Sequence, residues 1–158
     1  MFTYHYENKA AINAAIEVVF AFIDDHSNFS SHMNKSSWMM GGGKMTTTVD
    51  AGKGQKVGSH IIMNGAAFGI KLFLDEVITQ HNPPLTKTWK NVGNPRLVVI
   101  GHYQMGIEIT PQEKSSLLRV FIDYDLPSKH QWLGSLFGSL YAKWCVHQML
   151  QSASNSNH

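Results

Sequence analysis

Acidic, imidazole and phenol side chains recur in two apolar-rich stretches of the second half of the chain. One stretch holds His102 and Tyr103, the other holds Asp123 and Tyr124, and Tyr141 follows in the last third. Removing a proton beside a carbonyl group requires a base, and the enolate oxygen that develops requires a hydrogen-bond donor. Imidazole or carboxylate can supply the base, and a phenol can supply the donor. These five residues are therefore the candidate catalytic residues.

Strand register decides which of these side chains face the interior. Residues two apart on a strand share a face. If Tyr103 and Met105 face inward, His102 points away, which weakens a catalytic role for that histidine. Asp123 and Asp125 share a face and could act as an acid–base pair or bind a hard cation, but such pairs more often lie on a solvated face. The sequence leaves open whether any reaction is catalysed.

The spacing of the other chemistry-bearing residues argues against a metal, phosphate or disulfide site. Nine histidines are present, but none forms an H-x-x-x-H or H-E-x-x-H pair. Neither Gly43-Lys44 nor Gly52-Lys53 is followed by the hydroxyl residue of a phosphate-binding loop. Cys145 is the only cysteine, so an intramolecular disulfide cannot form. We therefore expect no metal and no cofactor.

Aromatic and methionine residues are the remaining conspicuous feature, above all in 36-SSWMMGGGKM-45, where a triple glycine adjoins apolar side chains. An ordinary core explains most of them. A pocket for a hydrophobic small molecule also explains their placement beside glycine, because such pockets are lined by apolar and aromatic groups. The residues predicted to bind a ligand are Trp38, Met39, Met40, Met63, Phe73, Trp89, Tyr103, Met105, Phe137, Tyr141 and Trp144.

The elements that must position these residues are predicted from hydrophobic period and turn chemistry. Alternating residues predict strands over 2–12, 45–50, 60–64, 70–81, 85–92, 97–109 and 117–126, with a turn at 93–95. Helical periods occur near 16–23, within 26–33 and over 129–151. One domain is expected over 1–151, followed by a polar, disordered tail over 152–158.

The last predicted helix carries two kinds of face. Its large apolar residues form one face, made by Leu133, Phe137, Leu140, Tyr141 and Trp144. A row of small residues lies beside it, made by Gly134, Gly138 and Ala142. Because glycine within a helix costs about 1 kcal/mol relative to alanine, we expect this row either to pack closely against a neighbour or to leave room for a ligand.

Composition narrows the classes of partner and location. A formal net charge of +2 and 15% charged residues do not provide the basic surface that nucleic-acid binding needs. The apolar run 14-AAIEVVFAFI-23 is too short to span a bilayer, so no stable membrane insertion is expected. The first residues, MFTYHYENK, lack the basic and apolar segments of a signal peptide. We expect a cytoplasmic protein.

The order of elements resembles that of the START-like (SRPBCC) superfamily, which includes polyketide cyclases and dehydratases and lipid-transfer domains. The stretches that carry the resemblance are 12-INAAIEVVFAFIDD-25, 56-KVGSHIIMNG-65, 76-EVITQHNPPLTKTW-89 and 120-VFIDYDLP-127, together with the helix that follows. The resemblance implies an α+β helix-grip fold. In this fold a curved, seven-stranded antiparallel sheet wraps a long C-terminal helix, and two short helices follow the first strand.

The resemblance also implies a cavity between the sheet and the last helix, with Trp38, Met39 and Met40 as an apolar lip at its entrance. Three functions remain open. The first is binding or transport of a small hydrophobic or aromatic ligand, such as a lipid, a polyketide or a quinone-like molecule. The second is a cyclase, dehydratase or aromatase reaction on a polyketide-like substrate. The third is a protein-interaction module, which would need an exposed apolar patch in place of an enclosed cavity.

Overall fold

The computed structural model describes residues 2–25, 45–67, 70–96, 100–127 and 131–155. Seven strands and two helices lie in these segments. They are β1 (Tyr4–Ile12), α1 (Ile16–Asp24), β2 (Met45–Val49), β3 (His60–Ala67), β4 (Ile70–Asn82), β5 (Thr86–Arg96), β6 (Tyr103–Pro111), β7 (Ser116–Tyr124) and α3 (Gln131–Asn155). The second short helix predicted within 26–33 lies outside the described residues.

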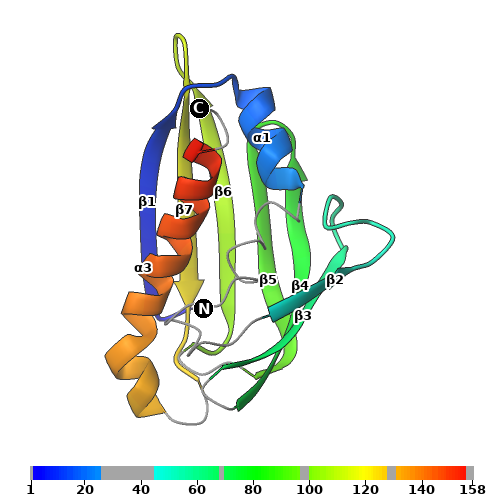
Figure 1. Cartoon of the computed structure of the whole chain (residues 1–158), viewed down its shortest axis with the longest axis vertical. Coiled ribbons are helices and arrows are strands. Elements are labelled where there is room, and N and C mark those ends of the chain that lie inside the picture. Colours follow the sequence, from blue (N-terminus) through cyan, green and yellow to red (C-terminus); the bar gives the residue numbers. More distant parts are fainter. Residues whose placement is uncertain (1, 26–44, 68–69, 97–99, 128–130, 156–158) are drawn as a thin grey trace.

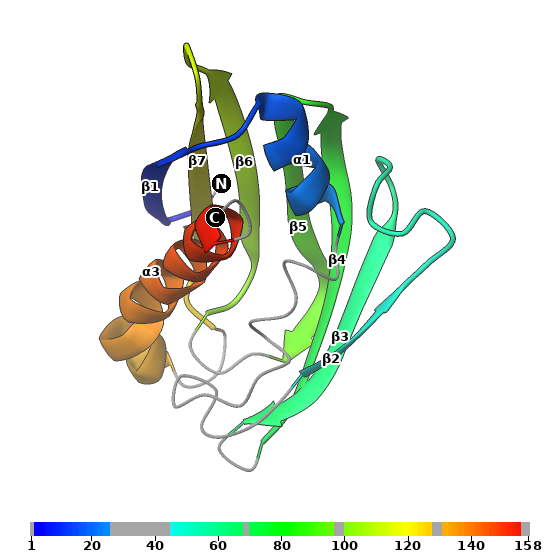
Figure 2. The ribbon, with the colours of Figure 1, turned by 45° about the horizontal axis from the view of Figure 1, so that its top comes forward.

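The strands form one antiparallel sheet in the order β1-β7-β6-β5-β4-β3-β2. The sheet is curved, and both helices lie on its concave side (Figure 1 and Figure 2). α3 packs against β1 and β7, and α1 packs against β6 and touches α3. This arrangement confirms the predicted helix-grip fold.

The core lies between the concave face of the sheet and the helices. Alternate residues of β6 and β7 are buried there, so that Ile107 pairs with Val120 and Met105 pairs with Ile122 on the same face. The residues between them point to the convex face, as the two-residue period of a strand requires. The alternation in these two strands therefore fixes which side chains meet the helices.

In its first half α3 buries its small residues instead of its larger ones. Gly134, Gly138 and Ala142 are buried, whereas Phe137 and Leu140 are exposed. The expectation of one continuous apolar face that packs on the core is therefore wrong for Phe137 and Leu140. Small side chains let the helix backbone approach the sheet closely, and the resulting packing offsets the cost of glycine in a helix.

Two predicted boundaries differ from the observed ones because of strand pairing. The residues 93-GNP-95, predicted as a turn, lie inside β5. Val92 pairs with Asp75 and Arg96 pairs with Phe73, so three residues of β5 oppose a single residue of β4. Such a bulge tolerates proline, which has no amide proton to donate, and the positive φ of Gly93.

The other differences concern element ends. The strand predicted over 97–109 begins at Tyr103, and residues 100–102 before it are not part of a strand. α3 continues to Asn155, beyond the predicted helix end at 151. Ala153 is fully buried, so the first part of the predicted tail is helical and packed against the core.

Candidate ligand-binding site

A buried carboxyl–phenol pair lies on the concave face of the sheet. Glu76 of β4 is 4% exposed and Tyr103 of β6 is 5% exposed. The Tyr103 hydroxyl donates a hydrogen bond to Oε2 of Glu76. Because β5 separates the two strands, this bond crosses the face of the intervening strand. The pair therefore joins two strands that are not neighbours in the sheet.

β5 positions the pair through two further inward-facing residues. Asn91 pairs with Glu76 in the sheet and is itself buried. Its Oδ1 accepts a hydrogen bond of 2.8 Å from the Tyr103 amide, and its Nδ2 donates to the Gly101 carbonyl at 3.1 Å. Trp89, two residues earlier on the same face, is buried and hydrogen-bonds to Glu76. These contacts hold the start of β6 at a fixed place beside β5.

The electrostatics of the pair follow from its burial. Burial raises the pKa of the Glu76 carboxyl to about 7, although hydrogen bonds from Tyr103 and Trp89 and the charge of Lys87 act in the opposite direction. The pKa of Tyr103 is raised well above its ordinary value, first by burial and then by the charge of Glu76. Near neutral pH the carboxyl therefore exists in both protonation states beside a neutral phenol.

α3 closes the other side of this site. Tyr141 and Cys145 lie one helical turn apart and share a hydrogen bond. Burial raises the pKa of the Cys145 thiol to about 12 and that of Tyr141 well above its ordinary value, and the charge of Glu76 adds to both shifts. The Trp144 ring packs beside Tyr141 at a centroid distance of 5.7 Å. Polar groups from β4, β5, β6 and α3 thus converge within an apolar interior.

A second buried cluster attaches the end of α1 to the sheet. Oδ1 of Asp24 lies 2.9 Å from Nζ of Lys87 and 2.9 Å from Nε2 of His81. The Phe20 ring meets the His81 ring edge-on at 5.6 Å. Burial lowers the pKa of Lys87, and Asp24 opposes this shift. Since Lys87 also lowers the pKa of Glu76, the cluster belongs electrostatically to the same site.

The structure brings together many of the residues predicted to bind a ligand. Tyr103 and Tyr141 both lie near Glu76, and Trp89 contacts it. Met63 and Met105 are buried in the same core, and Trp144 packs against that core. Trp38, Met39 and Met40 lie outside the described residues. The proposed lip at the entrance is therefore an expectation from sequence.

Two residues predicted to bind a ligand lie elsewhere. Phe73 pairs with Asn64 on the convex face, because it alternates with the buried Leu72 and Leu74. Phe137 is 44% exposed, as described above. Neither side chain lies in the core beside Glu76, so we leave both out of the site.

Two predicted catalytic candidates also lie on the surface. His102 is exposed, and its Nε2 lies 3.2 Å from the Gly93 carbonyl oxygen. Asp123 lies on the convex face of β7, where it pairs with His5. Tyr124 is buried directly opposite Tyr103 in the sheet, and its ring stacks on Tyr4 of β1. Of the five candidates, Tyr103 and Tyr141 are the two with a charge interaction with Glu76.

Glu76 is the residue that sequence reasoning missed. It follows Leu72 and Leu74 at two-residue spacing, so the strand period places it on the buried face. The adjacent Asp75 obscures this signal, because two neighbouring carboxylates in a sequence suggest an exposed, charged stretch. On a strand, however, adjacent side chains lie on opposite faces, so one of the two must point inward when the other points outward. An inward-facing carboxylate in an otherwise apolar strand face is the pattern that could have identified it.

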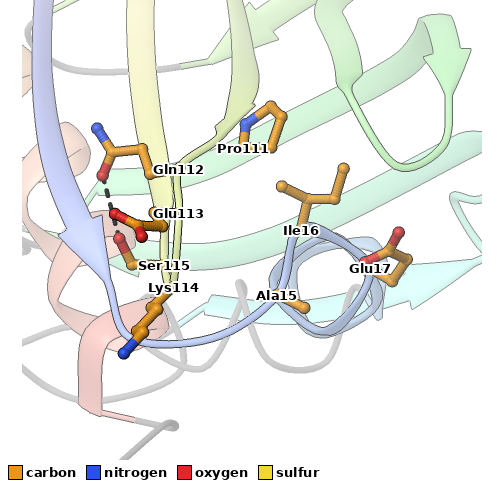
Figure 3. Close-up of a pocket in the computed structure, with 8 residues that line it drawn as sticks. All are labelled: Ala15, Ile16, Glu17, Pro111, Gln112, Glu113, Lys114 and Ser115. Carbon is orange, nitrogen blue, oxygen red and sulfur yellow. Dashed lines mark hydrogen bonds between the residues drawn. The ribbon is translucent and has the colours of Figure 1, made fainter.

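A separate pocket lies at the hairpin between β6 and β7. It has a volume of about 360 Å³ and is lined by Ala15, Ile16 and Glu17 at the start of α1 and by residues 111–115 (Figure 3). The Ser115 hydroxyl donates to Oε1 of Gln112 at 3.1 Å across the hairpin. None of the lining residues belongs to the predicted ligand-binding set, so this pocket is distinct from the Glu76 site.

No group of three or more His, Cys, Asp or Glu side chains in the described segments is arranged to hold a metal ion. No helix within the described part of the chain has the length and apolar character needed to cross a membrane.

Comparison with known proteins identifies the fold. No protein-family model and no curated protein matches the chain. Solved structures do match, among them norcoclaurine synthase from Thalictrum flavum, with a TM-score of 0.68 and 13% identity over 96% of this chain and 91% of that one. Major latex-like protein 151 from Panax ginseng matches with a TM-score of 0.63 and 13% identity, over 97% of this chain and 96% of that one.

A third similar structure is the di-domain ARO/CYC protein StfQ from the steffimycin biosynthetic pathway. It matches with a TM-score of 0.68 and 8% identity, over 97% of this chain and 50% of StfQ. The present chain therefore corresponds to about one half of that protein. Together these structures show the fold of the chain: a curved antiparallel sheet around a long C-terminal helix, which is the helix-grip fold.

Proposed function

We propose that the protein binds a small hydrophobic or aromatic molecule, of the lipid, polyketide or quinone-like class, between the concave face of the sheet and α3. The observation that carries this proposal is the buried Glu76–Tyr103 pair, which lies among apolar side chains from several elements. Apolar pockets with a few convergent polar groups and a shifted pKa are typical of ligand sites. We also propose that the protein is located in the cytoplasm.

The energetics of such a site are favourable. Enclosing a few hundred Å² of apolar ligand surface contributes several kcal/mol at roughly 25 cal/mol per Å², before the cost of association. The side chains proposed to supply this surface are Met63, Trp89, Met105, Tyr141 and Trp144, with Trp38, Met39 and Met40 at the entrance. Glu76 and Tyr103 would orient the ligand, because a protonated carboxyl group can donate to a carbonyl oxygen and accept from a hydroxyl group.

Native mass spectrometry of freshly purified protein tests the binding function. We expect a co-purified hydrophobic molecule, and weaker retention of it by the Glu76→Gln and Tyr103→Phe variants. Asp75→Asn is the matched control, since Asp75 is the neighbouring carboxylate on the convex face, where it pairs with His60. An empty protein, in which none of these variants changes binding of added hydrophobic molecules, would contradict the proposal.

A second function is favoured by the same pair. Glu76, with its pKa near 7, is matched to proton transfer at neutral pH. Once Glu76 has taken up a proton it can donate to the Tyr103 oxygen, which frees the phenol O–H to donate to a developing oxyanion. These two groups are what a cyclase or dehydratase reaction requires. The similar structures include proteins whose names denote a synthase and an ARO/CYC protein of a biosynthetic pathway, which supports this alternative.

Turnover assays distinguish the enzyme from the carrier. If the protein is an enzyme, Glu76→Gln should lower kcat on a polyketide-like substrate by about 100-fold or more, because the base is removed. Tyr103→Phe should lower it through loss of the donor. A carrier would bind the substrate without converting it, and both variants would then change binding alone.

A further inference from the structure

The first half of α3 presents an apolar face that the fold does not bury. Trp132 is 62% exposed, Leu136 is 65% exposed, and Leu140 is 46% exposed. These residues recur every four positions and therefore lie along one side of the helix. Phe137 extends the same face. We call these four residues the α3 apolar face.

This face points away from the rest of the molecule. At 100° per residue, Leu136 and Leu140 lie roughly opposite the buried Gly138 between them. The first turns of α3 also extend past the edge strand β1, as both views show (Figure 1 and Figure 2). α3 packs on the core through its opposite side, with Gly138 and Ala142 in the first half and large residues such as Val146 and Met149 further along. The α3 apolar face therefore has no role in holding the helix to the sheet.

The charge on α3 indicates which kind of surface this face would meet. Residues 131–155 contain no Asp or Glu. Lys143 follows Leu136 by seven residues, or about two turns, and therefore lies on the same side of the helix. It is exposed, with its Nζ 5.9 Å from the Tyr6 ring centroid. Lys129 and His130 immediately precede the helix in sequence.

We propose that the α3 apolar face docks on the surface of a bilayer that contains anionic lipids. An exposed apolar side with tryptophan, a lysine beside it and no carboxylate on the helix is the pattern of helices that lie in a membrane interface. The apolar residues would enter the boundary between headgroups and acyl chains. Lys143 would meet anionic headgroups, whose attraction for each basic residue adds to binding. The helix would lie on the membrane without crossing it.

The absence of acidic residues favours this occupant over another protein or a second copy of the chain. Contacts between proteins commonly pair charges of both signs across the rim of the interface. The charged side chains of α3 itself are of one sign only. A surface of uniform negative charge, as anionic lipids provide, is the complement to it.

Vesicle co-sedimentation tests the proposal with the full chain. The probe is a vesicle of phosphatidylcholine with about 30 mol% phosphatidylserine, compared with a vesicle of phosphatidylcholine alone. We expect binding to the anionic vesicles that weakens at high salt. Leu136→Glu should weaken that binding by about tenfold or more, because it removes apolar area and adds repulsion. Lys143→Gln should weaken it by several-fold and reduce its dependence on salt.

The matched control is Val57→Glu, since Val57 is 64% exposed in the connection between β2 and β3. It should bind the anionic vesicles as the wild-type protein does. Glu76→Gln should do so as well, which separates this proposal from the function of the interior site. Circular dichroism and thermal unfolding of each variant establish that it is folded.

Three results would overturn the proposal. One is an absence of vesicle binding by the wild-type protein. Another is equal binding to both kinds of vesicle, or equal binding by the wild-type protein and Leu136→Glu. The third is a wild-type dimer, or a stable complex with another protein, that Leu136→Glu dissociates while vesicle binding is unaffected, which would assign the face to a protein contact.

Discussion

The proton held by Glu76 is the residue-scale feature on which the interior site depends. Burial would keep an isolated carboxyl neutral, whereas Tyr103, Trp89 and Lys87 each favour the charged form. The balance leaves a pKa of about 7. A small change in the surroundings, such as entry of a ligand, can therefore shift this group from one protonation state to the other.

The stability of the protein should decrease as pH rises from about 5 to about 8. Glu76 binds its proton more tightly in the folded protein than in the unfolded chain, where its pKa is near 4.5. Its contribution is complete below that value and is lost as pH rises through about 7. Glu76→Gln should remove this part of the pH dependence, which amounts to at most about 3 kcal/mol. Urea unfolding at a series of pH values measures it.

A comparison of variants isolates the effect of Glu76. Hydrogen bonds that the His5 ring donates to the carboxylates of Asp123 and Glu7 raise the pKa of His5, so the wild-type slope contains a histidine contribution as well. Asp75→Asn should retain most of the wild-type slope, since the charge of Asp75 is the smallest of the contributions to the pKa of Glu76. Identical slopes for the wild-type protein and Glu76→Gln would show that Glu76 titrates normally.

At the element scale, α1 is attached to the sheet through one carboxylate with two basic partners. Asp24→Ala should destabilise the protein by about 3 kcal/mol, because it leaves the buried Lys87 without its ion-pair partner. Lys87→Met should cost much less, since Asp24 keeps His81 and retains some contact with solvent. Equilibrium denaturation of the two variants measures the difference. If both variants lost the same free energy of unfolding, the loss of the Asp24–Lys87 ion pair, and not the unpaired charge of Lys87, would determine the destabilisation.

The small residues of α3 set how close the helix lies to the sheet. Ala142 is fully buried, so Ala142→Leu should destabilise the protein by roughly 1–3 kcal/mol through overpacking. Ser135→Leu is the control, because Ser135 is exposed on the same helix and leucine has a similar or better helix propensity. Thermal unfolding of both variants distinguishes packing from propensity. If Ala142→Leu were stabilising, a void would have to lie beneath the helix at this point.

The strands could be predicted from sequence better than their ends. Alternation identifies the inner residues of β6 and β7, and Tyr103 and Met105 are buried as that alternation requires. The bulge at 93-GNP-95 could not be predicted, because it depends on the register between β5 and β4 and not on β5 alone. Element ends are decided by such partners, whereas element interiors are decided by their own side chains.

The candidate site could be predicted only in part, again because strand register cannot be read from one strand alone. Tyr103 and Tyr141 were identified by residue type, and both lie near Glu76. Phe73 was included by residue type as well, but the alternation of side chains along β4 places it on the convex face. Residue type alone selects aromatic groups on either face of a sheet, and only strand register separates them.

At the scale of the whole molecule, a bound ligand should contribute to stability. Protein from which hydrophobic molecules have been extracted by denaturation and refolding should have a lower Tm than protein as purified. Saturation at about 100 times the Kd corresponds to roughly 2.7 kcal/mol of stabilisation. Differential scanning calorimetry measures this difference. Mass spectrometry establishes that the molecule is present in the protein as purified and absent after extraction. An unchanged Tm between these two samples would mean that the ligand binds the unfolded chain as well as the folded one.

The pairing of β1 with β7 has a consequence for synthesis of the chain. Tyr4 lies opposite Tyr124, and Ile12 lies opposite Ser116. When β1 leaves the ribosome, β7, its neighbour in the described sheet, has not yet been made. The nascent chain must therefore carry an unpaired, aromatic-rich strand until most of the protein has been translated, and it is during this interval that chaperones would protect it from aggregation.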